Sequence, residues 1–177
     1  MVRSAALCPD EGCCGGGGIC GTSSSPGVRS WRWPPALLRA VGTCQVFVAL
    51  LSAGYFTSTW CGQEWYAFSQ RTVHGPPDSR NIAPVIWAPI YEDNVPSTVS
   101  SVQRFWPANL IDPDIAACYE REGIYGLHRM SKDFYRMVIW KLAQEIANMY
   151  YHHNAIPKIL NESDLQNPFK KNRHAQS

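Results

Sequence analysis

The sequence predicts an α/β protein with an open parallel sheet and flanking helices. Two continuous apolar runs, residues 46–51 and 83–90, have the composition of strands that are buried on both faces. Segments with helical periodicity follow, at residues 58–71 and 131–151. Strands that alternate with helices along a chain favour a parallel sheet, because each crossover places a helix on a face of the sheet.

Composition indicates one folded domain between two tails. The chain has 177 residues, 45% of them hydrophobic and seven of them Trp, which is enough apolar surface to exclude wholesale disorder. We assign residues 1–32 to a Gly/Cys/Ser-rich tail, residues 33–151 to the α/β domain and residues 152–177 to a polar tail. The formal net charge is only +2. No basic cluster of the kind that nucleic-acid binding requires occurs, so we expect no nucleic-acid partner.

Hydropathy gives no sign of a membrane partner. The longest apolar run, near residues 44–56, is too short to span a bilayer and contains Gln45, Ser52 and Gly54. No apolar stretch of about 7–15 residues follows Arg3, so the start does not read as a signal peptide. We therefore expect a cytoplasmic protein whose cysteines are reduced thiols.

The first 32 residues are of low complexity and show no strand or helix periodicity. They contain four of the seven cysteines, Cys8, Cys13, Cys14 and Cys20. Zinc knuckles usually present a Cys-x-x-Cys pair, and this spacing has none. We predict a flexible tail without a metal site.

The central stretch, residues 44–71, joins the clearest strand to a helix. Its apolar run stops at Ser52, and either Ser58 or Thr59 has a hydroxyl that can cap the helix that follows. Glu64 then lies in the second turn of this helix, between two tryptophans. In open α/β sheets ligands bind beyond the carboxyl ends of the strands, which is where this turn is expected.

Prolines constrain the second strand. Pro84 and Pro89 flank its most apolar residues, and proline cannot donate a ladder hydrogen bond. Both must therefore lie at the ends of the strand, or the strand must be an edge of the sheet.

Two more helices and a tail complete the chain. Asp112 and Pro113 suit the start of a short helix that Gly123 ends. Ser131 begins a longer one, whose two adjacent apolar rows predict packing on the sheet over most of its length. After residue 151 we expect a mobile polar tail, with a short helix or docking segment at residues 159–169.

The residues of the central stretch resemble those of the TIR domain family. The sequence reads VFVALLSAGYFTSTWCGQEW, which resembles the third strand and third helix of a flavodoxin-like TIR fold, in particular the bacterial FxsC type. The resemblance continues at APVIWAP and EGIYGL and covers about residues 33–151. It lacks the N-terminal part of the domain. We therefore expect an upstream reading-frame shift or a mis-assigned start before Trp33.

The resemblance implies chemistry at Glu64. In TIR domains that cleave NAD, the Glu of the WC-x-x-E motif is the catalytic residue, and Glu64 occupies this position. A carboxylate near the ribose stabilises the oxocarbenium-like state of glycosidic cleavage, and Trp60 and Trp65 offer flat surfaces to a ring. NAD is then a substrate, and no resident cofactor is expected. The alternative interpretation is a solvated Glu64 near Arg71, flanked by core tryptophans. For Cys61 we expect a buried thiol.

Three functions follow from these residues. The leading one is a signalling or assembly module that contacts other TIR-like domains, itself or partner proteins through the helices at Cys61 and Ser131. The second is an NAD glycohydrolase that uses Glu64. The third is a truncated remnant without function, whose exposed sheet edge would aggregate.

Overall fold

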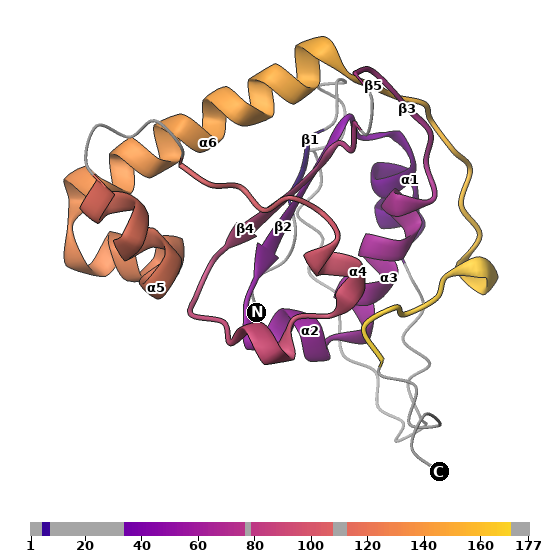
Figure 1. Cartoon of the computed structure of the whole chain (residues 1–177). Coiled ribbons are helices and arrows are strands. Elements are labelled where there is room, and N and C mark those ends of the chain that lie inside the picture. Colours follow the sequence, from indigo (N-terminus) through magenta and orange to yellow (C-terminus); the bar gives the residue numbers. More distant parts are fainter. Residues whose placement is uncertain (1–4, 8–33, 77–78, 108–112, 171–177) are drawn as a thin grey trace, which may run out of the picture.

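The computed structural model describes residues 5–7, 34–76, 79–107 and 113–170 (Figure 1). Its main sheet has three strands in the order β1 (Ala5–Leu7), β2 (Val46–Leu51) and β4 (Ile82–Ile86). β2 is the central strand and runs parallel to β4. The predicted buried strand at residues 46–51 is therefore confirmed with the same bounds.

Helices cover both faces of the sheet, which confirms the predicted α/β fold. On one face lie α1 (Pro35–Thr43), α2 (Ala53–Thr57) and α3 (Thr59–Ser69), and on the other lie α5 (Pro113–Met130) and α6 (Lys132–His152). Alternate residues of β2 enter the two cores: Phe47 packs toward α3, whereas Val46 and Val48 pack toward α5 and α6. All three are at most 5% exposed. The uninterrupted apolar run thus reflects two covering layers rather than one.

β4 ends at Ile86, earlier than the predicted residue 90, and Pro84 lies inside it. The alternative that this strand is an edge is confirmed, since β4 pairs only with β2 among the described strands. The Trp87 amide donates to the Leu51 carbonyl at 2.9 Å. The backbone N–H and C=O groups of odd-numbered residues in this segment therefore point toward β2. Pro84 therefore points its nitrogen at the open edge, where no ladder bond is lost.

Two groups from outside the sheet occupy the open edge of β4. The Phe105 amide donates to the Pro84 carbonyl at 2.8 Å, and the Ile86 amide donates to the Tyr119 hydroxyl at 2.9 Å. Burial raises the pKa of Tyr119 well above its usual range. The hydroxyl therefore stays protonated and accepts this bond as a neutral group.

β1 was not expected from the sequence, which predicts no strand in residues 1–32. Ala5–Leu7 nevertheless pairs antiparallel with β2, with Ala6 opposite Phe47. The free edge of β2 presents unpaired backbone groups, and three small or apolar residues suffice to bond them. The prediction is wrong at these three positions. The cysteines Cys8 to Cys20 lie outside the described residues.

α5 confirms the predicted break at Gly123 but continues beyond it. Gly123 has φ 67° and ψ −178°, a conformation that only glycine adopts readily, and the chain resumes as helix to Met130. A Cβ at this position would lie 2.8 Å from the Trp87 carbonyl carbon. The Tyr125 amide then donates to the Trp87 carbonyl oxygen at 2.9 Å. The break therefore lets α5 dock on the end of β4. Between β4 and α5 the chain forms two short helical turns, η1 (Glu92–Asn94) and α4 (Ser97–Ser100).

α6 begins where the sequence predicts, because the Ser131 hydroxyl accepts a bond from the Phe134 amide at 3.3 Å. Its predicted broad packing on the sheet is wrong. Only Val138 and Leu142 are fully buried in this helix, and α6 contacts mainly α5 and β2. Because the sheet is narrow, only one of the two predicted apolar rows of α6 is buried, and the other row is partly exposed to solvent.

The C-terminal segment, residues 154–170, is docked rather than mobile. It forms β5 (Asn154–Ala155) against β3 (Val73–His74) and the turn η2 (Glu162–Asp164), and it runs across α1 and α3. The Lys158 amide donates to the Gly42 carbonyl at 2.9 Å. A Cβ on Gly42 would lie 2.5 Å from the Lys158 carbonyl oxygen, so this crossing requires glycine. The mobile-tail prediction is wrong up to Lys170, and the docking-segment alternative is confirmed.

Arg71 anchors the start of this segment. It is 7% exposed, and its guanidinium donates to the carbonyl oxygens of Val41 (3.0 Å), Cys44 (2.6 Å), Ala155 (2.9 Å) and Ile156 (3.2 Å). Two of these carbonyls belong to the end of α1 or just beyond it, and two belong to the C-terminal segment. Arg71 thus joins the end of α1 to a segment that lies 85 residues after Arg71 itself.

Candidate functional site

The start of α3 sets the positions of the predicted site residues. The Ser58 hydroxyl accepts a bond from the Cys61 amide at 3.3 Å, which confirms the predicted cap. The helix that starts here places Cys61 and Trp65 in one buried hydrophobic cluster. Cys61 is 8% exposed, as the expectation of a buried thiol requires.

The three predicted site residues differ in their exposure. Glu64 is 5% exposed, so it is not the solvated carboxylate of the alternative interpretation. Trp65 is 2% exposed and belongs to the core, as the alternative interpretation expects for both tryptophans. Trp60, in contrast, is only half-buried. The three residues are close in sequence, but α3 does not place their side chains on one open surface.

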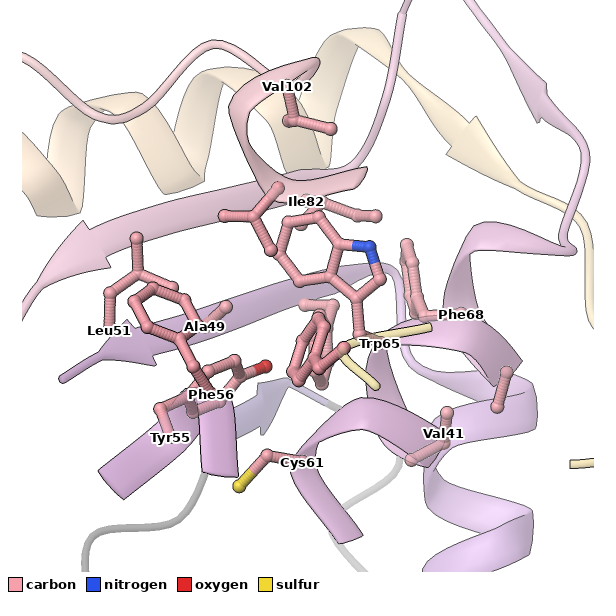
Figure 2. Packing of buried hydrophobic residues seen from close by; sticks show 14 of the residues in the cluster. Val41, Ala49, Leu51, Tyr55, Phe56, Cys61, Trp65, Phe68, Ile82 and Val102 are labelled. Atoms are coloured by element: carbon pink, nitrogen blue, oxygen red, sulfur yellow. The ribbon is translucent and has the colours of Figure 1, made fainter. Parts of the chain in front are cut away.

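Trp65 belongs to an aromatic cluster on the α3 side of the sheet. Figure 2 shows its indole between α3 and the sheet, beside Phe68 and Ile82, with Phe56 and Tyr55 of α2 farther along the same layer. Phe169 of the C-terminal segment packs against this cluster, with ring centroids 6.1 Å from Trp65 and 5.6 Å from Tyr55. The cluster therefore needs the docked segment to be complete.

A pocket of about 790 Å³ opens next to this cluster, beyond the carboxyl ends of β2 and β4. Its walls come from α2, from the turn between η1 and α4, and from the end of the C-terminal segment. The lining residues are Ala53, Phe56, Thr57, Asn94, Val95, Pro96, Ser97, Pro168, Phe169 and Lys170. This edge of an open α/β sheet is where ligands generally bind.

The pocket and the predicted residues are separate. Glu64, Trp60 and Trp65 are not among the residues that line it. No sequence pattern singled out the pocket residues, although Phe169 is the last residue of the segment predicted to dock. Across residues 5–7, 34–76, 79–107 and 113–170, no group of three or more potential ligand side chains could hold a metal ion.

The sequence model of the TIR domain matches residues 25–117, which is just over half of the chain. The chain belongs to the TIR-domain family. A TIR domain is a signalling module, and TIR domains generally interact with other TIR domains. The match includes β2, α3, β4 and Glu64. It begins eight residues before Trp33 and ends within α5, so the TIR resemblance of residues 118–151 stays a prediction.

No curated protein and no solved structure matches the chain. Two walls of the pocket lie within the TIR match, whereas the third, Pro168–Lys170, lies beyond it. Within the part of the chain that the structure describes, no helix of this TIR protein has the length and apolar character needed to cross a membrane.

Proposed function

We propose that the chain acts as a TIR-type signalling or assembly module through protein–protein contacts, including contacts between copies. The outer face of α6 carries this proposal. Trp140 is 65% exposed and Tyr151 78% exposed, and Met137 lies on the same side of the helix. Positions 137, 140, 144, 147 and 151 are spaced by three or four residues, so they form one stripe opposite the buried row.

An exposed indole in such a stripe favours a contact surface. Aromatic residues and Met are enriched at the centres of protein interfaces, and a few of them contribute most of the binding free energy. The helix at Cys61 is the less accessible of the two helices predicted to make contacts, because Gly62 of α3 faces Asn167 and Phe169 of the C-terminal segment. We therefore assign the contact to α6.

Sedimentation velocity over a range of protein concentrations tests this proposal. We expect concentration-dependent association that Trp140→Ser weakens by about tenfold or more, as for an interface hot spot. Arg129→Ser, on the exposed end of α5, is the matched control and should leave association unchanged. A chain that stays monomeric at every concentration, and whose TIR-domain partners bind the Trp140→Ser variant equally well, would contradict the proposal.

We also propose, as a second function, that Glu64 is the carboxylate of an NAD-cleaving reaction, with Trp60 and Trp65 beside it. Its burial favours this role, because a carboxylate interacts more strongly with a developing positive charge where water is excluded. NAD would be the substrate, cleaved to nicotinamide and an ADP-ribose product. Trp65 contributes as a rigid support, and the half-buried Trp60 is the one with surface available to a ring.

Nicotinamide release from NAD distinguishes the two functions. If the chain is an NAD-cleaving enzyme, we expect nicotinamide release that Glu64→Gln abolishes. Glu145→Gln, which changes an exposed carboxylate on α6, should leave release unchanged. No release at any protein concentration supports the interaction module alone. A weakly cooperative melt with aggregation, together with loss of both activities, would instead indicate the non-functional remnant.

We further propose a cytoplasmic location and the bacterial FxsC type. Cys118 is a buried free thiol, which suits a reducing compartment. The FxsC assignment rests on the motif from Val46 to Trp65.

A further inference from the structure

We propose that the pocket beside α2 binds a small molecule with a flat apolar ring system and one anionic group, and that the docked C-terminal segment completes this site. The inference goes beyond the proposed function, because the pocket is separate from both Glu64 and the outer face of α6. Its volume, about 790 Å³, lies in the range of small-molecule sites.

The apolar part of the pocket suits a planar ring. Phe56 and Phe169 are 9% and 8% exposed, and their rings meet edge to face with centroids 6.1 Å apart. These two rings form a mostly covered floor, and the half-buried Val95, Pro96 and Pro168 provide the accessible apolar walls. Proline rings offer a flat ligand a rigid contact surface at low entropic cost, because the ring fixes their conformation.

The charged part of the pocket suits an anion. Among the lining residues that the structure describes, Lys170 is the one with a charged side chain, and none is a carboxylate. Of the two acidic residues of η1, Glu92 is held by Arg104 in a bidentate ion pair at 2.7 and 2.9 Å, and Asp93 does not line the pocket. Asn94 and Ser97 add an amide and a hydroxyl as hydrogen-bond donors. A negative group on the ligand is therefore favoured over a positive one.

The site depends on the docked segment, since Pro168, Phe169 and Lys170 form one of its three walls. The Asn167 side chain accepts a bond from the Phe169 amide at 3.0 Å, which turns the ring inward. A Cβ on Gly62 would meet the Asn167 side chain and the Phe169 ring, so the segment crosses α3 closely at this glycine. Because the ligand binds only the docked form, it also stabilises docking of the segment.

A matched pair of dyes tests the proposal on the full chain. 1-Anilinonaphthalene-8-sulfonate carries the ring system and an anion, and N-phenyl-1-naphthylamine is its neutral counterpart. We expect saturable fluorescence enhancement with one site per chain for the sulfonate. Lys170→Ala should weaken binding of the sulfonate by about two- to fivefold, as for an exposed ion pair, and leave the neutral dye unchanged. Lys132→Ala, which removes the same charge at the start of α6, should affect neither dye.

A second variant separates binding from folding. Ala53 is exposed on α2 and lines the pocket, so Ala53→Trp fills the space without touching the core. We expect it to abolish saturable binding of both dyes while the melting temperature stays the same. Trp140→Ser removes the other exposed aromatic surface and should leave binding intact.

Two results would overturn the proposal. One is sulfonate binding that survives Ala53→Trp or is lost in Trp140→Ser, which would place the dye on α6. The other is the absence of saturable binding to a chain that melts cooperatively.

Discussion

Arg71 offers the sharpest test of how the fold is held together. Replacing it by Met keeps most of the apolar stem and removes the guanidinium. Four carbonyl oxygens, those of Val41, Cys44, Ala155 and Ile156, then lose their common donor. Two of these bonds hold Arg71 to Val41 and Cys44 and the other two hold it to Ala155 and Ile156, so the change should weaken docking of the C-terminal segment first.

The expected loss can be bounded. Hydrogen bonds from a charged donor contribute about 1.5–3 kcal/mol each, so four bonds set an upper limit of roughly 6–12 kcal/mol. Removing a buried cation also removes its desolvation cost, and water reaches carbonyls near the surface. A buried carbonyl that loses its donor costs about 1–3 kcal/mol, and we expect Arg71→Met to cost about 3–5 kcal/mol in total once these offsets are included. That is a large part of the stability of a small domain.

Urea unfolding followed by Trp fluorescence measures this loss, and trypsin cleavage after Lys158 reports docking of the segment. Arg71→Lys keeps a charge but has one nitrogen for the four oxygens, so we expect an intermediate loss. Arg129→Met, at an exposed position, controls for removal of an arginine. If Arg71→Met lowers the free energy of unfolding by less than about 1 kcal/mol and leaves Lys158 protected, then Arg71 does not hold the segment.

Three further substitutions test other contacts. Gly123→Ala should cost more than about 2 kcal/mol in urea unfolding, because the φ of 67° and the Trp87 backbone both exclude a Cβ; an unchanged midpoint would contradict this. Tyr119→Phe leaves the Ile86 amide without its acceptor and should cost about 1–3 kcal/mol at neutral pH. Since the folded pKa of Tyr119 is raised, its contribution is complete below about pH 10 and is lost as pH rises further, so the wild type should lose stability more steeply above pH 10 than Tyr119→Phe does. Gly42→Ala gains about 1 kcal/mol of helix propensity but meets the Lys158 carbonyl, and faster trypsin cleavage after Lys158 is the expected result; slower cleavage would show that the segment adjusts.

Local signals explain which parts of the fold were predictable from sequence. The bounds of β2 were predicted because its apolar run has no polar interruption. The starts of α3 and α6 were predicted because the hydroxyls of Ser58 and Ser131 each accept a hydrogen bond from the amide three residues later. Gly123 marked a break because glycine readily adopts the positive φ that the break requires. Each of these signals lies within a few residues of the structure that it specifies.

Long-range contacts explain what was missed. Docking of residues 154–170 depends on Arg71, Gly42 and Gly62, which lie far away in sequence, and no local pattern identifies two glycines as sites of close approach. The same holds for the pocket, whose walls come from three distant segments. Burial of Glu64 could not be read from α3 either, since a helical carboxylate is exposed in most proteins.

The proline within β4 limits how copies of this chain can associate. A protein that joins others by strand addition needs a row of free amides and carbonyls, and here a missing donor, a loop amide and a phenol interrupt that row. Growth of a continuous intermolecular sheet from this border is therefore blocked. Assemblies that use this border must therefore form through side-chain surfaces, and point substitutions on helices should dissolve them without unfolding the subunit.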